Sequence, residues 1–201
     1  MIRTLVLIVR RPDISRKEFR DHYEDVHAPL AIPSMQGLKH YLRNHVAEAL
    51  NGVEPGFDVL TEFGYGCAED VKHIVDLLEL PEGAHIRRDE LTFMDTQRNT
   101  FFAIGDPVVV AGGEEVPEGA VKVAALVKTA AEGAFAPLLA AGPLRAVTHA
   151  VLGGPHGEPP WDEVAFFWYT PGALEDEHLR GWAPDATRAV LLRVDPCRTP
   201  L

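Results

Sequence analysis

The sequence lacks the features of secreted, membrane-spanning and nucleic-acid-binding proteins. Its two cysteines, Cys67 and Cys197, are too few and too far apart for a disulfide framework or a zinc knuckle. No apolar run approaches the roughly 20 residues of a membrane span. A formal net charge of −11 offers no basic face to nucleic acid or to an anionic membrane. We therefore expect a cytoplasmic protein with neither of these partners.

The N-terminal apolar segment is predicted to be a buried strand. Its apolar core, Leu5 to Val9, is shorter than the apolar region of a signal peptide and runs directly into Arg10 and Arg11. Hydrophobic residues make up 46% of the chain, which indicates a folded core. The G-x-G-x-x-G, G-x-x-x-x-G-K-[ST] and G-x-S-x-G motifs are absent, which argues against dinucleotide, P-loop and α/β-hydrolase chemistry.

A helix is predicted to begin after Ser15, because Ser15 and Glu18 form a capping box. Apolar residues at helical spacing mark its buried stripe: Phe19, Tyr23 and Val26. Pro29 disfavours the α conformation at Ala28, so we expect this helix to stop near His27.

The first half has a β-α-β-β-α-β pattern, which is typical of ferredoxin-like folds. After the first strand and helix, its other elements are strands at 38–47, 57–65 and 97–104 and a helix at 68–80. The second half repeats part of this pattern, with strands at 121–128, 162–169 and 187–194 and a helix at 171–182. The Ala-Pro-Leu step at 28–30 recurs at 136–138 and is again followed by a ten-residue strand, in which Leu144 corresponds to Leu38, but the helix before the step is shortened to a turn or two.

We therefore predict an α+β protein with two tandem ferredoxin-like halves, at residues 1–107 and 118–201, joined by a glycine-rich linker at 108–117. A ferredoxin-like unit leaves one apolar sheet face bare, and two such faces commonly pack together. Packing within one chain would give an intrachain pseudo-dimeric α+β barrel and favour a monomer, although a homodimer stays open.

The segment SRKEFRDHYEDVHAPLA, followed by GLKHYLRNH, resembles the EthD-like family. The residues that carry the resemblance are Ser15, Phe19, Tyr23, His27-Ala28-Pro29 and Tyr41. The resemblance implies a dimeric α+β barrel, small hydrophobic substrates and no organic cofactor. The family is associated with bacterial ether degradation, and some fungal relatives are linked to decarboxylation or dehydration of aromatic polyketides.

Tyr23 and His27 are four residues apart, so they are predicted to share one helix face. An imidazole beside a phenol could act as a general acid/base with an orienting donor. The structural alternative is that His27 caps the helix by donating to a nearby backbone carbonyl.

The strand at 38–47 places Lys39, Tyr41, Arg43 and His45 on one face by alternation. We expect the other, more apolar face to pack under the helices, so that the polar face lines the barrel interior. There Arg43 could hold a carboxylate or enolate oxygen, and His45 or Tyr41 could move a proton. The alternative is an open, wet sheet edge.

No metal site is expected. His22 and His27 are five residues apart, which turns them about 140° from each other on an α-helix. His40 and His45 would lie on opposite strand faces, and His156 falls in a segment that is predicted to be a solvated loop.

The leading hypothesis is an enzyme that uses cofactor-free acid/base chemistry on a hydrophobic, aromatic or polyketide-like substrate, by decarboxylation, dehydration, cyclisation or oxygenation. Its candidate catalytic residues are His27, Tyr23, Tyr41, Arg43 and His45. Two alternatives stay open: a small-ligand carrier without chemistry, and a haem protein, which ranks last because no cysteine is expected near the barrel interior.

Overall fold

The structure, a computed structural model, describes residues 1–130, 132–154, 158–175 and 177–201. The chain forms two compact units. Unit 1 comprises Met1–His45, Gly56–Phe101 and Cys197–Leu201, and unit 2 comprises Val46–Pro55 and Phe102–Pro196. Three strands contribute residues to both units: β2 (Leu38–Ala49), β4 (Thr100–Ile104) and β9 (Ala186–Arg198). No described helix is both long enough and apolar enough to cross a membrane.

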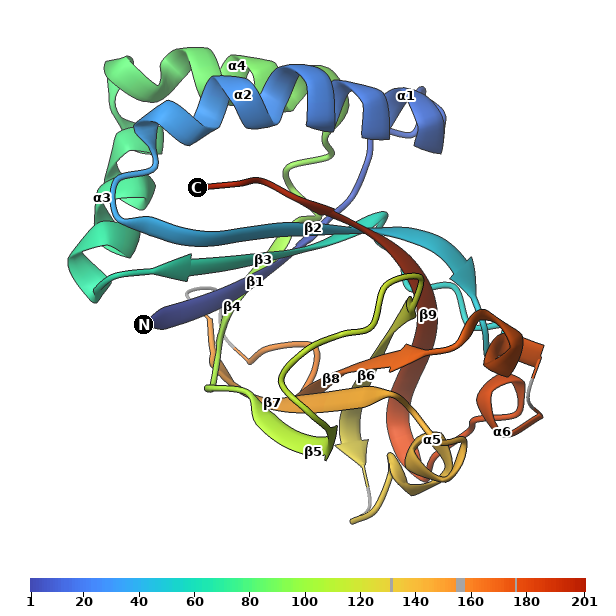
Figure 1. Cartoon of the computed structure of the whole chain (residues 1–201). Coiled ribbons are helices and arrows are strands. Elements are labelled where there is room, and N and C mark those ends of the chain that lie inside the picture. The colour runs from blue at the N-terminus through green and yellow to red at the C-terminus, as the bar shows by residue number, and fades with distance from the viewer. Residues whose placement is uncertain (131, 155–157, 176) are drawn as a thin grey trace. The chain divides into compact units, whose positions relative to one another are not determined.

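Unit 1 is built on a sheet with the strand order β4-β1-β3-β2, in which β3 pairs antiparallel with both β1 and β2. Strand β1 (Ile2–Ile8) is the predicted N-terminal strand, and β3 covers Val59–Tyr65. Helices α1 (Arg16–His22), α2 (Ala28–Ala31) and α4 (Ala84–Phe93) lie along one side of these strands (Figure 1).

Helix α1 begins where the sequence predicts it. The backbone N–H of Ser15 donates to Oε2 of Glu18 at 2.8 Å, and that of Glu18 donates back to the Ser15 hydroxyl at 3.2 Å. This confirms the capping box and satisfies two backbone donors that a helix start would otherwise leave unpaired.

The prediction that this helix stops near His27 is wrong. A π-helical turn, η1 (Tyr23–His27), follows α1, and the chain then continues through α2 into the 3₁₀ turn η2 (Ile32–Ser34). Ala28 has helical angles (φ −60°, ψ −47°) and donates its N–H to Tyr23 O, which closes the wide turn. Pro29 lies in the first turn of α2, and Ala28 before it keeps the α conformation that a following proline disfavours.

The π turn also changes which residues are buried. Tyr23 and His27 are 1% and 4% exposed, whereas Val26, predicted to be in the buried stripe, is 46% exposed. The wide turn inserts one residue into the 3.6-residue period, so the stripe read from α-helical spacing fails at its last member.

The second helical region of unit 1 contains one helix that the sequence predicts and one that it does not. Helix α3 (Ala68–Glu79) matches the predicted helix at 68–80. After the 3₁₀ turn η3 (Pro81–Gly83) comes α4, which was not predicted. Its buried apolar residues, Ile86 and Phe93, are seven positions apart, which is two turns of one helix face.

Unit 2 contains the strand order β9-β6-β8-β7-β5. Its strands are β5 (Val108–Gly112), β6 (Val121–Ala130), β7 (Arg145–Gly153) and β8 (Glu163–Tyr169), followed by β9. The predicted linker therefore begins with a strand, which pairs antiparallel with β7. The Ala-Pro-Leu step itself forms α5 (Ala136–Ala140), and the described residues before it, 132–135, form a turn in place of the predicted shortened helix. The predicted helix at 171–182 is replaced by the 3₁₀ turn η4 (Pro171–Glu175) and α6 (Glu177–Arg180).

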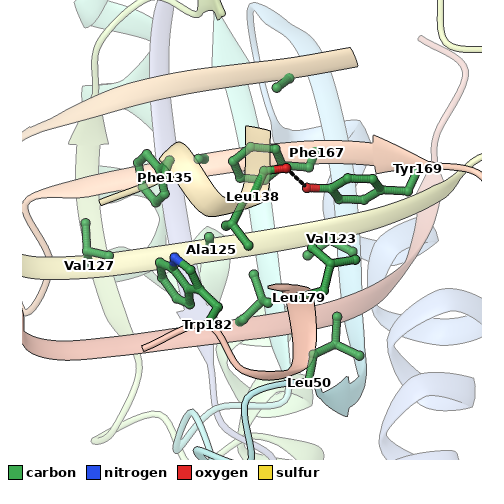
Figure 2. Close-up of a cluster of buried hydrophobic side chains, with 13 residues drawn as sticks. Leu50, Val123, Ala125, Val127, Phe135, Leu138, Phe167, Tyr169, Leu179 and Trp182 are labelled. Carbon is green, nitrogen blue, oxygen red and sulfur yellow. Dashed lines mark hydrogen bonds between the residues drawn. The ribbon is translucent and has the colours of Figure 1, made fainter. Parts of the chain in front are cut away.

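The core of unit 2 holds α5 in place despite its five residues. Figure 2 shows Leu138 and Phe135 packed among side chains of β6, β8 and α6. The Tyr169 hydroxyl donates to Leu138 O at 2.6 Å, and the Trp182 indole N–H donates to Ala134 O at 2.9 Å. Two buried aromatic residues thus satisfy backbone carbonyls at this short helix, as buried polar groups require.

Candidate functional site

Unit 1 contains a cavity of about 190 Å³ between its helices and its sheet. Most of its lining is apolar, with contributions from β1, β3, α3 and the start of β4. The polar side chains that line it are Tyr23, His27, Tyr41, Tyr65, Glu90 and Asn99. A largely apolar cavity with a few convergent polar groups is the usual form of a small-molecule site.

Helix α4 supplies a carboxylate that two histidines share. Nδ1 of His27 lies 2.8 Å from Oδ2 of Asp89, and Nε2 of His22 lies 2.8 Å from Oδ1 of the same side chain. The expectation that His22 and His27 point about 140° apart is therefore wrong. In a π turn the hydrogen bonds join residues five apart, so these two positions stack as neighbours. The alternative of a His27 cap on a backbone carbonyl is also wrong, because Nδ1 meets this carboxylate instead.

The environment of His27 favours its neutral form. Burial lowers the pKa of His27, and the hydrogen bond and charge of Asp89 oppose this shift without reversing it. A neutral imidazole that contacts a carboxylate through Nδ1 carries its proton there, which leaves Nε2 as an acceptor. The ring lines the cavity, so His27 is oriented as a general base would be, with Nε2 free to accept a proton.

Glu90 is the neighbour of Asp89 and lines the same cavity. Burial, together with repulsion from Asp89, raises the pKa of Glu90 from 4.5 to about 7. A carboxyl group with this pKa exchanges a proton near neutral pH. The cavity therefore holds one group whose pKa is lowered and one whose pKa is raised, which is the arrangement found in acid/base pairs.

The two tyrosines form a buried hydroxyl chain. The Tyr41 hydroxyl donates to that of Tyr23 at 3.4 Å, and the Tyr23 hydroxyl lies 3.0 Å from Oγ1 of Thr61. Burial raises the pKa of Tyr23 to about 12 and that of Tyr41 well above its usual value. Both phenols therefore stay protonated at neutral pH and can serve as hydrogen-bond donors.

Arg43 and His45 lie outside the cavity lining, and both bind Glu24 of the π turn. Arg43 donates to Glu24 through Nε at 2.9 Å and Nη2 at 2.6 Å, and Nε2 of His45 lies 2.6 Å from Oε1 of Glu24. Burial alone would raise the pKa of Glu24, but hydrogen bonds from His45 and Arg43 lower it to about 2. The three side chains form a compact ion cluster.

This cluster corrects the predicted orientation of β2. The face that carries Tyr41, Arg43 and His45 packs against the helical segment of unit 1, where Tyr41 joins the same buried cluster as Phe19 and Tyr23. It was expected to face away from the helices. The physical reason is Glu24, whose half-buried carboxylate requires cationic partners beneath the helix.

One group of side chains in unit 1 could hold a metal ion. Ligand atoms of Glu24, His45 and Cys197 lie within 4.8 Å of one another. Arg43 already contacts this carboxylate, and Nη2 of Arg20 lies 3.5 Å from Sγ of Cys197. The resident cations therefore neutralise the position that an ion would take. Cys197 reaches this group because the end of β9 belongs to unit 1. His156 lies outside the described residues.

The sequence did not reveal the acidic residues of the site. Asp89 and Glu90 belong to the unpredicted helix α4, and Glu24 lies in the predicted first helix, where no spacing or motif marks it. The available signal for α4 was the two-turn spacing of Ile86 and Phe93. That spacing would have placed Asp89 and Glu90 one turn before Phe93, near the buried face.

Two proteins of known structure are similar in fold to this chain. An anthrone oxidase-like protein of known structure shares 11% identity, with a TM-score of 0.57 over 98% of this chain and 92% of that one. A proposed monooxygenase from Fusobacterium nucleatum shares 9% identity, with a TM-score of 0.50 over 96% and 91%. Both likenesses show a shared mixed α+β fold.

An EthD family protein from Bacillus halodurans shares 22% identity and covers 58% of this chain and 100% of its own, with a TM-score of 0.39. No curated protein matches the sequence. The family model of the EthD domain matches residues 11–97, the segment that contains the π turn, β2, β3, α3 and α4. Residues 11–97 of this chain are an EthD domain.

Proposed function

We propose that the EthD domain is an enzyme that moves a proton on a small molecule bound in the unit 1 cavity, without an organic cofactor. The observation that carries this proposal is the 2.8 Å contact between His27 Nδ1 and Asp89, in a cavity that Glu90 also lines. A base held in one tautomer by a carboxylate is the recurring form of an activated histidine.

In the proposed reaction, Nε2 of His27 takes a proton from the substrate while Asp89 stabilises the imidazolium that forms. Glu90, protonated in part of the molecules at neutral pH, returns a proton to the substrate. The hydroxyl of Tyr23 or Tyr41 donates to the oxygen on which negative charge develops. This sequence suits decarboxylation, dehydration or cyclisation, because each of these passes through an enolate-like or carbanion-like state.

The cavity favours a substrate with a single ring. A cavity of about 150 Å³ holds benzene in a protein core, and this one measures about 190 Å³. Aromatic rings form one wall, where Tyr41 and Phe63 stack at 4.8 Å between centroids and Phe63 and Tyr65 at 6.1 Å. A planar ring would pack against this wall, which narrows the expectation of a polyketide-like substrate to a small aromatic one.

We assign Arg43 and His45 positioning roles. The Arg43 guanidinium lies 4.3 Å from the centre of the Tyr41 ring, and the His45 and Tyr23 rings are 6.0 Å apart. By holding Glu24 between them, Arg43 and His45 fix the helix turn that carries Tyr23 and His27. Their replacement is expected to reduce turnover through geometry and not through loss of a reacting group.

Proton transfer can be tested with phenylacetone, a single-ring ketone with exchangeable hydrogens, incubated with the protein in D₂O and followed by NMR. Wild-type protein should accelerate exchange, and His27→Gln should lower that rate about 100-fold or more. His73→Gln, at an exposed position on α3, is the matched control. Equal exchange by the wild type and His27→Gln, with both proteins folded, would refute the role of His27.

The second candidate function is a carrier that binds small aromatic molecules without chemistry, which the same apolar wall favours. Saturable binding of phenylacetone without exchange at any pH would support it. A pH profile separates the two functions, because exchange by an enzyme should follow the ionisation of its base.

We also infer that the two units are copies of one ferredoxin-like unit. The order β9-β6-β8-β7 in unit 2 repeats β4-β1-β3-β2 in unit 1, position for position along the chain. The intrachain pseudo-dimeric barrel stays a prediction of this proposal. Native mass spectrometry tests it, because a complete internal barrel favours a monomer of 22.1 kDa.

A further inference from the structure

Unit 2 has a cavity of its own, of about 560 Å³, which the proposed function does not use. Four strands and one helix form its walls: β5, β6, β7, β8 and α5. Its volume falls in the range of roughly 300–1,000 Å³ that is usual for small-molecule sites. The cavity therefore has room for a ligand larger than a single ring.

One wall of this cavity is apolar. Val127 and Phe135 belong to the buried core of unit 2, and Leu139 packs against that core (Figure 2 labels the first two). Val110 adds an apolar side chain that is 42% exposed. A hydrocarbon group that fills this space would remove exposed apolar surface from water, which stabilises binding.

Every charged residue in the described lining of this cavity is an acid: Glu132, Asp162 and Glu163. Asp162 already has partners, because Lys128 Nζ lies 2.7 Å from its Oδ1 and the backbone N–H of Thr129 donates to its Oδ2 at 2.6 Å. Within the described part of the chain, the Glu163 carboxylate has no hydrogen bond or ion pair. Burial raises its pKa, as expected for a carboxylate without a compensating charge.

The edge of this cavity also holds a strained residue. Thr129 has a φ of 50°, and no other non-glycine residue in the described ranges has a positive φ. A β-branched residue in this conformation is a conformational outlier, and such strain persists where surrounding contacts fix it, commonly at binding sites. Here the fixing contacts are those of Asp162, which accepts from the Thr129 N–H and pairs with Lys128 at the edge of the cavity.

We propose that this cavity binds small apolar primary amines. The ammonium group lies beside Glu163, which gains the cationic partner that it lacks, and the hydrocarbon part packs against Val127, Phe135 and Leu139. The negative charge of the lining favours cationic ligands, because it repels carboxylates and phosphates. This binding is independent of the proton transfer proposed for unit 1.

The test uses the full chain and three probes that differ in charge: phenethylamine, 2-phenylethanol and phenylacetate. We expect ¹H–¹⁵N shifts at the amides of Val127, Thr148 and Glu163 with the amine, weaker binding of the alcohol, and none of the anion. Glu163→Gln should weaken amine binding about tenfold or more and leave binding of the alcohol unchanged. Glu118→Gln, which removes an exposed acid of unit 2 outside this lining, is the matched control.

A second variant tests the cavity itself. Ala150→Trp, at an exposed position of the lining, should fill the space and abolish binding of both the amine and the alcohol. The proposal is overturned if phenethylamine binds Glu163→Gln as tightly as the wild type. It is also overturned if the amine shifts only amides of unit 1, or if folded Ala150→Trp retains full amine binding.

Discussion

Nδ1 of His27 and Oδ2 of Asp89 lie 2.8 Å apart, although the two residues are 62 positions apart in the sequence. The contact joins the end of the π turn to α4, and each of the two side chains satisfies a hydrogen-bonding group of the other. The buried imidazole needs an acceptor for its Nδ1 proton, and the carboxylate needs donors on both oxygens. This contact shows that α4, which the sequence does not predict, contributes a carboxylate to the site.

Asp89→Asn should lower the pKa of His27 further, because the carboxylate opposes the effect of burial on that histidine. Titration of the His27 ring by NMR measures this directly. The substitution should also destabilise the fold by about 1–3 kcal/mol, since it disturbs two histidine hydrogen bonds. Asp76→Asn, at an exposed acid on α3, is the control and should leave the His27 titration unchanged.

Glu90→Gln should make stability less dependent on pH. The pKa of Glu90 is raised to about 7 in the folded protein, so the unfolded chain loses this proton first as pH rises. Wild-type stability should therefore fall between about pH 4.5 and 7 from this group. The variant should gain about 2 kcal/mol relative to wild type from pH 4 to pH 8 in urea unfolding. A constant difference over that range would contradict the assignment.

Glu24→Gln should have the opposite pH signature. The pKa of Glu24 is lowered to about 2, so its stabilising contribution is present above about pH 4.5 and is lost as pH falls toward 2. At pH 7 the variant should be destabilised by about 2 kcal/mol or more, since Arg43 and His45 lose a charged partner. Acid unfolding curves of the two proteins should converge near pH 2.

Tyr23→Phe should destabilise the protein more than Tyr41→Phe. The first change removes a 3.0 Å contact and leaves the hydroxyl of Thr61, which is fully buried, without that partner. We expect a cost of about 1–3 kcal/mol. The second removes a donor at 3.4 Å, which is the longer contact. Thermal unfolding of the two variants tests this order. The reverse order would show that the Tyr41 hydroxyl contributes more to stability than the Tyr23 hydroxyl.

Thr129→Asn should preserve or raise stability. Asparagine tolerates a positive φ better than a β-branched residue does, and the backbone N–H that binds Asp162 is retained. We expect a gain of about 0.5–1 kcal/mol. Thr129→Val keeps the strain and serves as the control. A loss with asparagine equal to that with valine would show that the threonine hydroxyl stabilises this turn.

The sequence predicts those features of the fold that a short-range rule governs. The Ser15 capping box and strand β1 follow from local rules, and both were predicted. The continuation through Pro29 was missed, because a π turn is stabilised by tertiary contacts and has no periodic signature. The orientation of β2 depended on Glu24, and no pattern within the strand itself carries that information. Asp89 required α4, whose exposed polar residues obscured its narrow apolar face.

The π turn has a consequence for comparing this chain with its relatives. A chain with one residue fewer between Phe19 and Pro29 could continue this segment as a regular α-helix, so aligning it to this sequence without a gap would displace either Tyr23 or His27. The position of a one-residue gap therefore decides which histidine is matched to which. A deletion within 23–27 is expected to restore the regular helix and to separate His22 and His27 from their common carboxylate. In this domain, the site depends on the hydrogen-bond spacing of the helix as well as on residue identity.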